Sequence, residues 1–258
     1  MSDSVVQPLA EPVPQPAPGL SQIQRVIYTF TAPSKTFNDI KAGHRSWWLP
    51  FLITLLVSYL FFAAVYTKIG MRQVAENSIH LNAKQEARMA DMPADQREAA
   101  MKFTTYLTEG IFLASPVLML LVIAVVSLVL WGTINFAFGG KATFGGIFCV
   151  CMYAGLTGIV TVLLSVIVIF AGTAPESFNL NNPAPTNIAA LFLNPLETNK
   201  ALYTLLKSLD AVTIWNLVLM SIGLATVAGV KKGSGYISVF GWWILLVLIG
   251  VGAAAVMG

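Results

Sequence analysis

The chain has 258 residues, of which 56% are hydrophobic and only 10% are charged. A soluble globular domain carries about 25% charged residues. The composition therefore excludes an ordinary soluble domain and indicates an integral membrane protein. The net charge of +3 is small, and we expect no nucleic-acid partner.

The first segment, residues 1–20, carries prolines at positions 8, 12, 14, 16 and 18. It has neither the basic start nor the apolar core that a secretory signal needs. Its composition predicts a disordered, proline-rich tail.

The next segment, residues 21–45, has an amphipathic helical pattern ahead of the first long apolar stretch. Four apolar residues recur at i, i+3, i+4 and i+7, which indicates one face of a helix, and basic residues lie beside them. Such segments usually lie on a membrane surface, where lysine and arginine meet anionic headgroups. We expect an anchor there, and also the docking surface of any soluble partner. The residues assigned to this role are Ile23, Arg25, Val26, Ile27, Phe30, Lys35 and Lys41.

Five stretches of the remaining chain contain no acidic residue, lysine or arginine, and each is long enough for one helical crossing of a bilayer. They predict an all-α integral membrane protein whose domain 46–258 has five transmembrane helices, at about 48–67, 111–138, 144–171, 211–230 and 237–257. Amphipathic helices are expected in the two long loops. In the second loop, a leucine stripe over residues 202–209 predicts an interfacial helix with Lys200 and Lys207 toward water.

The basic residues indicate the orientation. Short loops rich in lysine and arginine face the cytoplasm, and one side of the predicted bundle collects Arg25, Lys35, Lys41, Arg45, Lys141, Lys231 and Lys232. We therefore expect the N-terminus inside and the C-terminus outside, in a bacterial cytoplasmic membrane.

The sequence offers little for catalysis. Neither a metalloprotease, hydrolase nor nucleotide-binding motif occurs, and the glycine-rich segment 139–146 is a turn rather than a phosphate loop. Cys149 and Cys151 point to opposite helix faces. We predict no catalytic residue, cofactor or metal ligand, and no acidic or basic side chain at membrane depth.

Polar and small residues inside the apolar stretches predict helix packing. Asn135 and Asn216 are expected to form interhelical hydrogen bonds; a path for a neutral solute between them is the alternative. Small residues four positions apart let helices approach closely, within one chain or between copies, so a homo-oligomer stays open. These residues are Ser221, Ala225, Gly229, Gly250, Ala254, Gly258, Ala154 and Gly158.

Several motifs, taken in order, resemble the prokaryotic branch of the Yip domain family, the five-span membrane proteins that interact with Ypt and Rab GTPases. They are Phe30-Thr31-Ala32-Pro33, Phe37-Asn38-Asp39-Ile40, Trp48-Leu49-Pro50, Gly139-Gly140-Lys141-Ala142-Thr143-Phe144, Tyr153-Ala154-Gly155-Leu156, Leu209-Asp210-Ala211-Val212-Thr213-Ile214-Trp215, Gly223-Leu224 and Lys231-Lys232. The resemblance implies a five-span bundle with a cytoplasmic N-terminal tail and no catalytic residue. Eukaryotic members carry an Asp-Leu-Tyr-Gly-Pro type motif where this chain has Phe30-Thr31-Ala32-Pro33.

Together these features predict a non-enzymatic multi-pass membrane protein that organises or adapts membrane partners. The lipid bilayer and an unidentified membrane or soluble protein are its expected partners. The alternative is a channel or permease subunit for a neutral solute.

Overall fold

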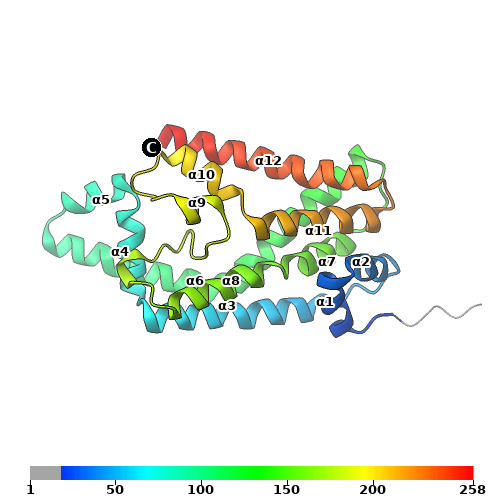
Figure 1. Cartoon of the computed structure of the whole chain (residues 1–258), viewed down its shortest axis with the longest axis horizontal. Helices are drawn as coiled ribbons and strands as arrows, with labels where there is room; N and C mark the ends of the chain where they lie inside the picture. Colours follow the sequence, from blue (N-terminus) through cyan, green and yellow to red (C-terminus); the bar gives the residue numbers. More distant parts are fainter. Residues whose placement is uncertain (1–18, 258) are drawn as a thin grey trace, which may run out of the picture.

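The structure, a computed structural model, describes residues 19–257, so most of the predicted tail lies outside the described residues. Those residues form a bundle of α-helices without a named β-strand, which confirms the predicted fold class (Figure 1). Five helices are long and apolar enough to cross a membrane. They are α3 (Trp48–Lys68), α6 (Ala94–Gly132, continued by the π-helix η1, Thr133–Ala137), α7 with α8 (Phe144–Gly155 and Gly158–Phe170), α11 (Ala211–Ala228) and α12 (Lys232–Met257).

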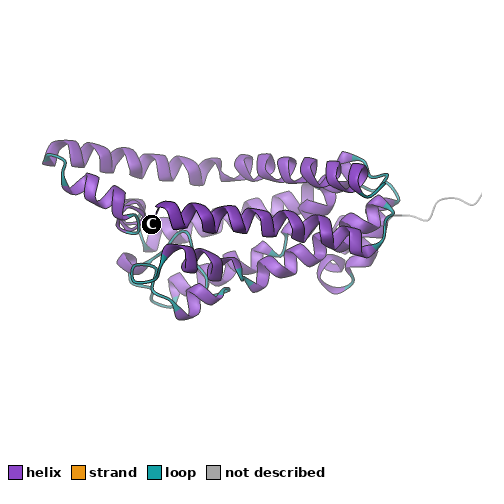
Figure 2. Ribbon diagram, turned by 90° about the horizontal axis from the view of Figure 1, so that it is seen from above, coloured by secondary structure: helices purple, strands orange, loops and turns teal. Residues whose placement is uncertain are grey.

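The bundle has two different ends (Figures 1 and 2). One end, called the hairpin end below, holds the hairpin of α1 (Gln22–Thr31) and α2 (Pro33–Lys41), together with the α6–α7 and α11–α12 turns. The opposite loop end holds α4 (Met71–His80), α5 (Ala83–Ala90), η2 (Pro175–Ser177), α9 (Ile188–Phe192) and α10 (Lys200–Ser208).

Local sequence signals set the helix ends. Ser21 forms a capping box with Gln24 at the start of α1. Asp210 accepts a hydrogen bond from the Thr213 amide and so caps the start of α11. Gly229 ends α11 with φ +71, a left-handed conformation that favours glycine.

The core lies between the long helices near the hairpin end. One apolar cluster joins α6, α7, α11 and α12, and a second joins α2, α7 and α11. Cys151 belongs to the first cluster and Cys149 to the second, so the two thiols lie on different faces of α7. Phe37 and Ile40 of α2 are fully buried in the second cluster. The hairpin is thus part of the bundle's core and not an appended arm.

At the loop end, α6 extends well beyond its apolar part and packs against α4. The Arg72 guanidinium binds both carboxylate oxygens of Glu98 at 3.0 Å and also Glu76 at 2.9 Å. The hydrogen bond from Arg72 lowers the pKa of the Glu98 carboxyl. Because these groups are exposed, the ion pair orients α4 on α6 and adds little stability.

Candidate functional site

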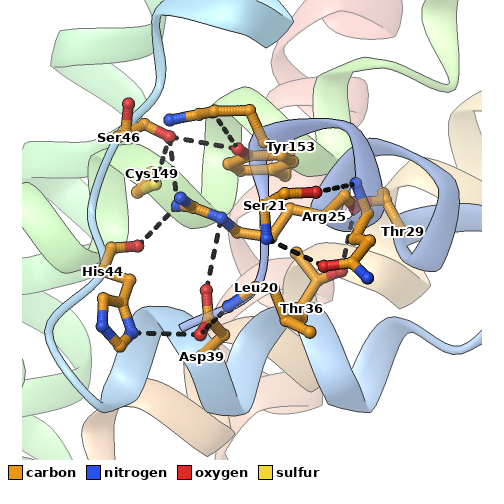
Figure 3. Close-up of polar contacts among 12 residues, drawn as sticks. Leu20, Ser21, Arg25, Thr29, Thr36, Asp39, His44, Ser46, Cys149 and Tyr153 are labelled. Atoms are coloured by element: carbon orange, nitrogen blue, oxygen red, sulfur yellow. Dashed lines mark hydrogen bonds and ion pairs between the residues drawn. The ribbon is translucent and has the colours of Figure 1, made fainter. Parts of the chain in front are cut away.

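The α1–α2 hairpin is held to the bundle by Arg25, whose side chain is buried although it carries a charge. Its guanidinium nitrogen Nη1 donates to the carbonyl oxygens of His44 at 2.7 Å and Ser46 at 3.4 Å (Figure 3). Its Nε lies 3.2 Å from Asp39 Oδ2, an ion pair without the geometry of a hydrogen bond. Arg25 therefore fastens α1 to α2 and to the segment that leads into α3.

Asp39 is the anionic centre of the same cluster. Its Oδ1 accepts a hydrogen bond from the Leu20 amide at 3.0 Å and lies 3.0 Å from Nδ1 of His44 (Figure 3). Its side chain is only 8% exposed, whereas that of His44 is 43% exposed. A buried carboxylate needs such partners, because an unpaired charge in the interior is strongly destabilising.

Tyr153 links this cluster to the third membrane helix. Its hydroxyl oxygen lies 3.1 Å from the Ser46 carbonyl oxygen and 3.0 Å from Oε1 of Gln22. The Arg25 guanidinium carbon lies 5.9 Å from the centre of the tyrosine ring, within the range of a cation–π contact. We call Arg25, Asp39, His44, Ser46 and Tyr153 the junction cluster.

The outward face of α1 is apolar. Ile23 is 66% exposed, Ile27 52% and Phe30 37%, while Val26 packs partly against the core. Phe30 also makes an edge-to-face contact with Trp215 of α11, with ring centroids 5.7 Å apart. The helix thus turns its polar residues inward and its apolar stripe outward, opposite to a helix on a soluble core.

The exposed face of α2 is polar and basic. Ser34, Lys35, Asn38 and Lys41 are exposed at helical spacing on the side away from the core. The Lys35 ammonium lies 4.8 Å from the centre of the Tyr28 ring. We call these four α2 residues the basic face.

The structure therefore divides the residues that the sequence assigned to membrane-surface docking. Ile23, Ile27, Phe30, Lys35 and Lys41 are exposed. Arg25 cannot meet lipid headgroups, because its guanidinium is used inside the junction cluster. Sequence analysis named Asp39 and Tyr153 only within the motifs of the resemblance, and it gave neither them nor Ser46 a role in a site. The one signal for the cluster is that Arg25 and Thr29 are four residues apart, opposite the apolar stripe.

The two intramembrane asparagines form hydrogen bonds at two different turns. Asn135, in η1, exchanges two hydrogen bonds of 2.9 Å with the backbone of Ala142 and thereby closes the α6–α7 turn. Asn216 of α11 donates to the Ala154 carbonyl at 2.9 Å and to Oγ1 of Thr157 at 3.2 Å. The two hydrogen bonds of Asn216 lie at the point where the third span is interrupted between α7 and α8, although the sequence predicted one continuous helix there.

The stripes of small residues have different roles. Ser221 and Ala225 form a close contact with α12, because a Cβ atom built at Gly235 would lie 2.3 Å from the Ser221 carbonyl oxygen and 2.9 Å from Ala225 Cβ. Gly229 is a helix cap, and Ala154 and Gly158 flank the α7–α8 interruption. Gly250 and Ala254 face the short helix α10 and its surroundings rather than another membrane helix. Gly258 lies outside the described residues.

Among the described residues, no group of three or more histidine, cysteine, aspartate or glutamate side chains is placed to hold a metal ion. In the junction cluster, the polar side chains bond to one another and to backbone carbonyls. This arrangement fixes the hairpin in place.

A family model described as the Yip1 domain matches residues 27–254 of the chain, which is nearly its whole length. No curated protein and no solved structure matches the chain. The matched region begins inside α1 and includes α2 and all five membrane helices.

Proposed function

Because the chain belongs to the Yip1 domain family, we propose that it is a non-enzymatic, multi-pass membrane adaptor whose α1–α2 hairpin binds a soluble or membrane partner. The five apolar helices place the protein in a lipid bilayer. The adaptor role rests on the hairpin, which has exposed residues on both of its helices.

One observation carries this proposal: the hairpin is built into the core, yet it presents two faces that the described residues leave exposed. Burying an isoleucine or phenylalanine side chain is worth about 1.5–3 kcal/mol, so Ile23, Ile27 and Phe30 gain free energy when lipid covers them. With the apolar stripe of α1 in the membrane surface, the basic face of α2 is left for a partner with an acidic surface.

The distribution of charge supports a cytoplasmic position for the hairpin end. Lys141, Lys231 and Lys232 lie in its two short turns, beside the exposed Lys35 and Lys41. Lysine and arginine in short loops favour the cytoplasmic side. We therefore propose that the N-terminus is inside and the C-terminus outside, in a bacterial cytoplasmic membrane.

The channel or permease alternative has weaker support. Asn135 and Asn216 bond to different turns, and buried apolar residues such as Leu217 and Leu224 of α11 fill the bundle near the hairpin end. A polar path between the two asparagines would need these residues to separate. A second copy of the chain on the exposed apolar face of α12 is compatible with either function.

Reversing the charge of the basic face tests the adaptor proposal. We expect the double variant Lys35→Glu/Lys41→Glu to lower the recovery of proteins that co-purify with the chain in mild detergent by at least about tenfold, since like charges would face an acidic partner at a cost of roughly 1.4 kcal/mol or more. Quantitative mass spectrometry of the purified material measures this recovery.

The control is Lys84→Glu, which reverses another exposed lysine, on α5 at the other end of the molecule. It should leave recovery unchanged. Equal recovery of every co-purifying protein with the double variant and the control would contradict a docking role for the basic face.

A further inference from the structure

The helix α11 is shorter than α6 and α12 and begins beside the interruption of the third span. At the hairpin end its last residue is level with the α6–α7 turn, because the Lys141 amide donates to the Ala228 carbonyl at 3.1 Å. At the other end, its first turn lies beside the α7–α8 interruption: Val212 and Thr213 line a cavity of about 200 Å³ together with Thr157 and Thr161.

The helix α3 shows how deep this point is. The ring of Trp47, just before α3, contacts the ring of Phe148, and the Lys68 ammonium at its end lies 5.1 Å from the centre of the Phe170 ring. At 1.5 Å per residue, α3 is about 30 Å long, the thickness of a bilayer core. The stretch 148–170 is therefore level with a whole crossing, and Thr157 lies near its middle. Asn216, whose amide bonds to Thr157, lies at the same depth, and Asp210 caps α11 six residues farther toward the loop end.

The short helix α10 reaches a similar depth from the loop end. Thr204 approaches Gly250, whose Cβ position would lie 3.9 Å from Thr204 Cγ2. Lys207 lines a cavity of about 300 Å³ with Leu246 and Val247, which lie near the middle of α12. The prediction of an amphipathic helix here is confirmed, but its depth is not that of a surface helix. Lys207 is level with the middle of α12, where no charge was expected.

Polar residues occupy the loop-end half of the bundle, between α8 and α12. The side chains of Asn182, Asn187 and Tyr203 form a hydrogen-bonded group, with distances of 2.7–3.3 Å. Asn182 and Tyr203 also line a further cavity of about 250 Å³. Charged and amide groups at mid-depth are costly in lipid and normally face other protein groups or a water-filled cavity.

The half of the bundle that lies toward the hairpin end is closed, because apolar side chains fill it. On the hairpin-end side of Asn216, one apolar cluster buries the residues Leu217, Leu224, Ile147 and Cys151. Asn216 donates both hydrogen bonds from its amide nitrogen, and it lines the cavity beside Thr157.

From these positions we propose that the loop-end half of the bundle is a water-filled vestibule, which admits water and small hydrophilic solutes as far as Asn216 at mid-depth. The vestibule is lined by α8, α10 and the start of α11. It ends at the apolar cluster that lies on the hairpin-end side of Asn216. The vestibule is independent of the adaptor proposal, since it lies at the opposite end from the basic face.

Cysteine accessibility tests the vestibule in the full-length protein. In a background with Cys149→Ala and Cys151→Ala, single cysteines replace Thr213 in the vestibule, Leu163 on the outward face of α8 and Asn181 in the loop. Membranes are opened by freeze–thaw, so that a small, charged methanethiosulfonate reagent reaches both sides and the result does not depend on orientation. Retained thermal stability of each variant shows that it is folded.

We expect Thr213→Cys to react within about tenfold of the rate of the loop control Asn181→Cys, because water reaches both thiols. Leu163 is at a similar depth and 42% exposed; on a face covered by lipid, Leu163→Cys should react at least a hundredfold more slowly than the loop control. A Thr213→Cys rate as low as that of Leu163→Cys would overturn the vestibule. Equally fast reaction at both positions would overturn it too, since α8 would then lie outside the bilayer.

Discussion

Replacing Arg25 by methionine is expected to detach the α1–α2 hairpin and to lower the free energy of unfolding by about 3–5 kcal/mol, as when one partner of a buried ion pair is removed. The substitution leaves the Asp39 carboxylate buried with only His44 and the Leu20 amide as partners. It also removes the donor to the His44 and Ser46 carbonyls. Thermal unfolding in detergent and the rate of proteolysis between α2 and α3 measure the effect.

Arg45→Met is the matched control, because Arg45 is a neighbouring arginine that is exposed. A surface substitution of this kind changes stability by about 0.5 kcal/mol or less. If Arg25→Met and Arg45→Met unfold at the same temperature and resist protease equally, the junction cluster does not hold the hairpin.

Replacing Gly235 by valine is expected to separate α11 from α12. A Cβ at this position would lie 2.3 Å from a backbone carbonyl oxygen of Ser221, and backbone cannot move aside as a flexible side chain can. Overpacking typically costs about 1–3 kcal/mol and occasionally more, and we expect the upper part of this range. The yield of monodisperse protein and its melting temperature should both fall.

Gly241→Val on the same helix provides the comparison, since nothing lies within 4 Å of a Cβ built at Gly241 and the residue is exposed. Both substitutions change helix propensity equally, so the difference between them reports on packing alone. Equal melting temperatures for the two variants would show that α11 and α12 are not in close contact at Gly235.

Composition and hydropathy suffice to predict the five membrane helices, because a charge-free stretch of the right length has few alternatives in a folded chain. They cannot predict the interruption of the third span. The stretch Phe144–Ala171 contains no charged residue, and the break at Leu156 and Thr157 is stabilised by Asn216 from another helix. A window along one helix does not contain that partner.

The periodicity of residues 23–30 predicts the helix α1 and its apolar stripe, but not which face is buried. In water the apolar stripe would turn inward, whereas beside lipid the polar face can turn inward and pair, as Arg25 does with Asp39. The depth of α10 also cannot be predicted from its sequence pattern. Its leucine stripe predicts an amphipathic helix correctly, but the depth follows from where α11 begins.

The stripe of Ser221 and Ala225 shows that a local sequence pattern can predict one side of a helix contact. Small residues at this spacing predict a close helix contact, and α11 and α12 do approach closely there. The partner residue Gly235 has no signal of its own, since it is one of several glycines in α12.

In the proposed arrangement, the apolar stripe of α1 holds the hairpin end against an anionic membrane surface, and α2 faces water. A fluorophore sensitive to polarity, attached at Ile27→Cys in the full-length protein reconstituted in vesicles, tests this most directly, with Lys41→Cys as the comparison. We predict blue-shifted emission at position 27 that is quenched by lipid-attached quenchers, more strongly in anionic than in zwitterionic vesicles, and water-like emission at position 41. Water-like emission at both positions in both kinds of vesicle would contradict the account.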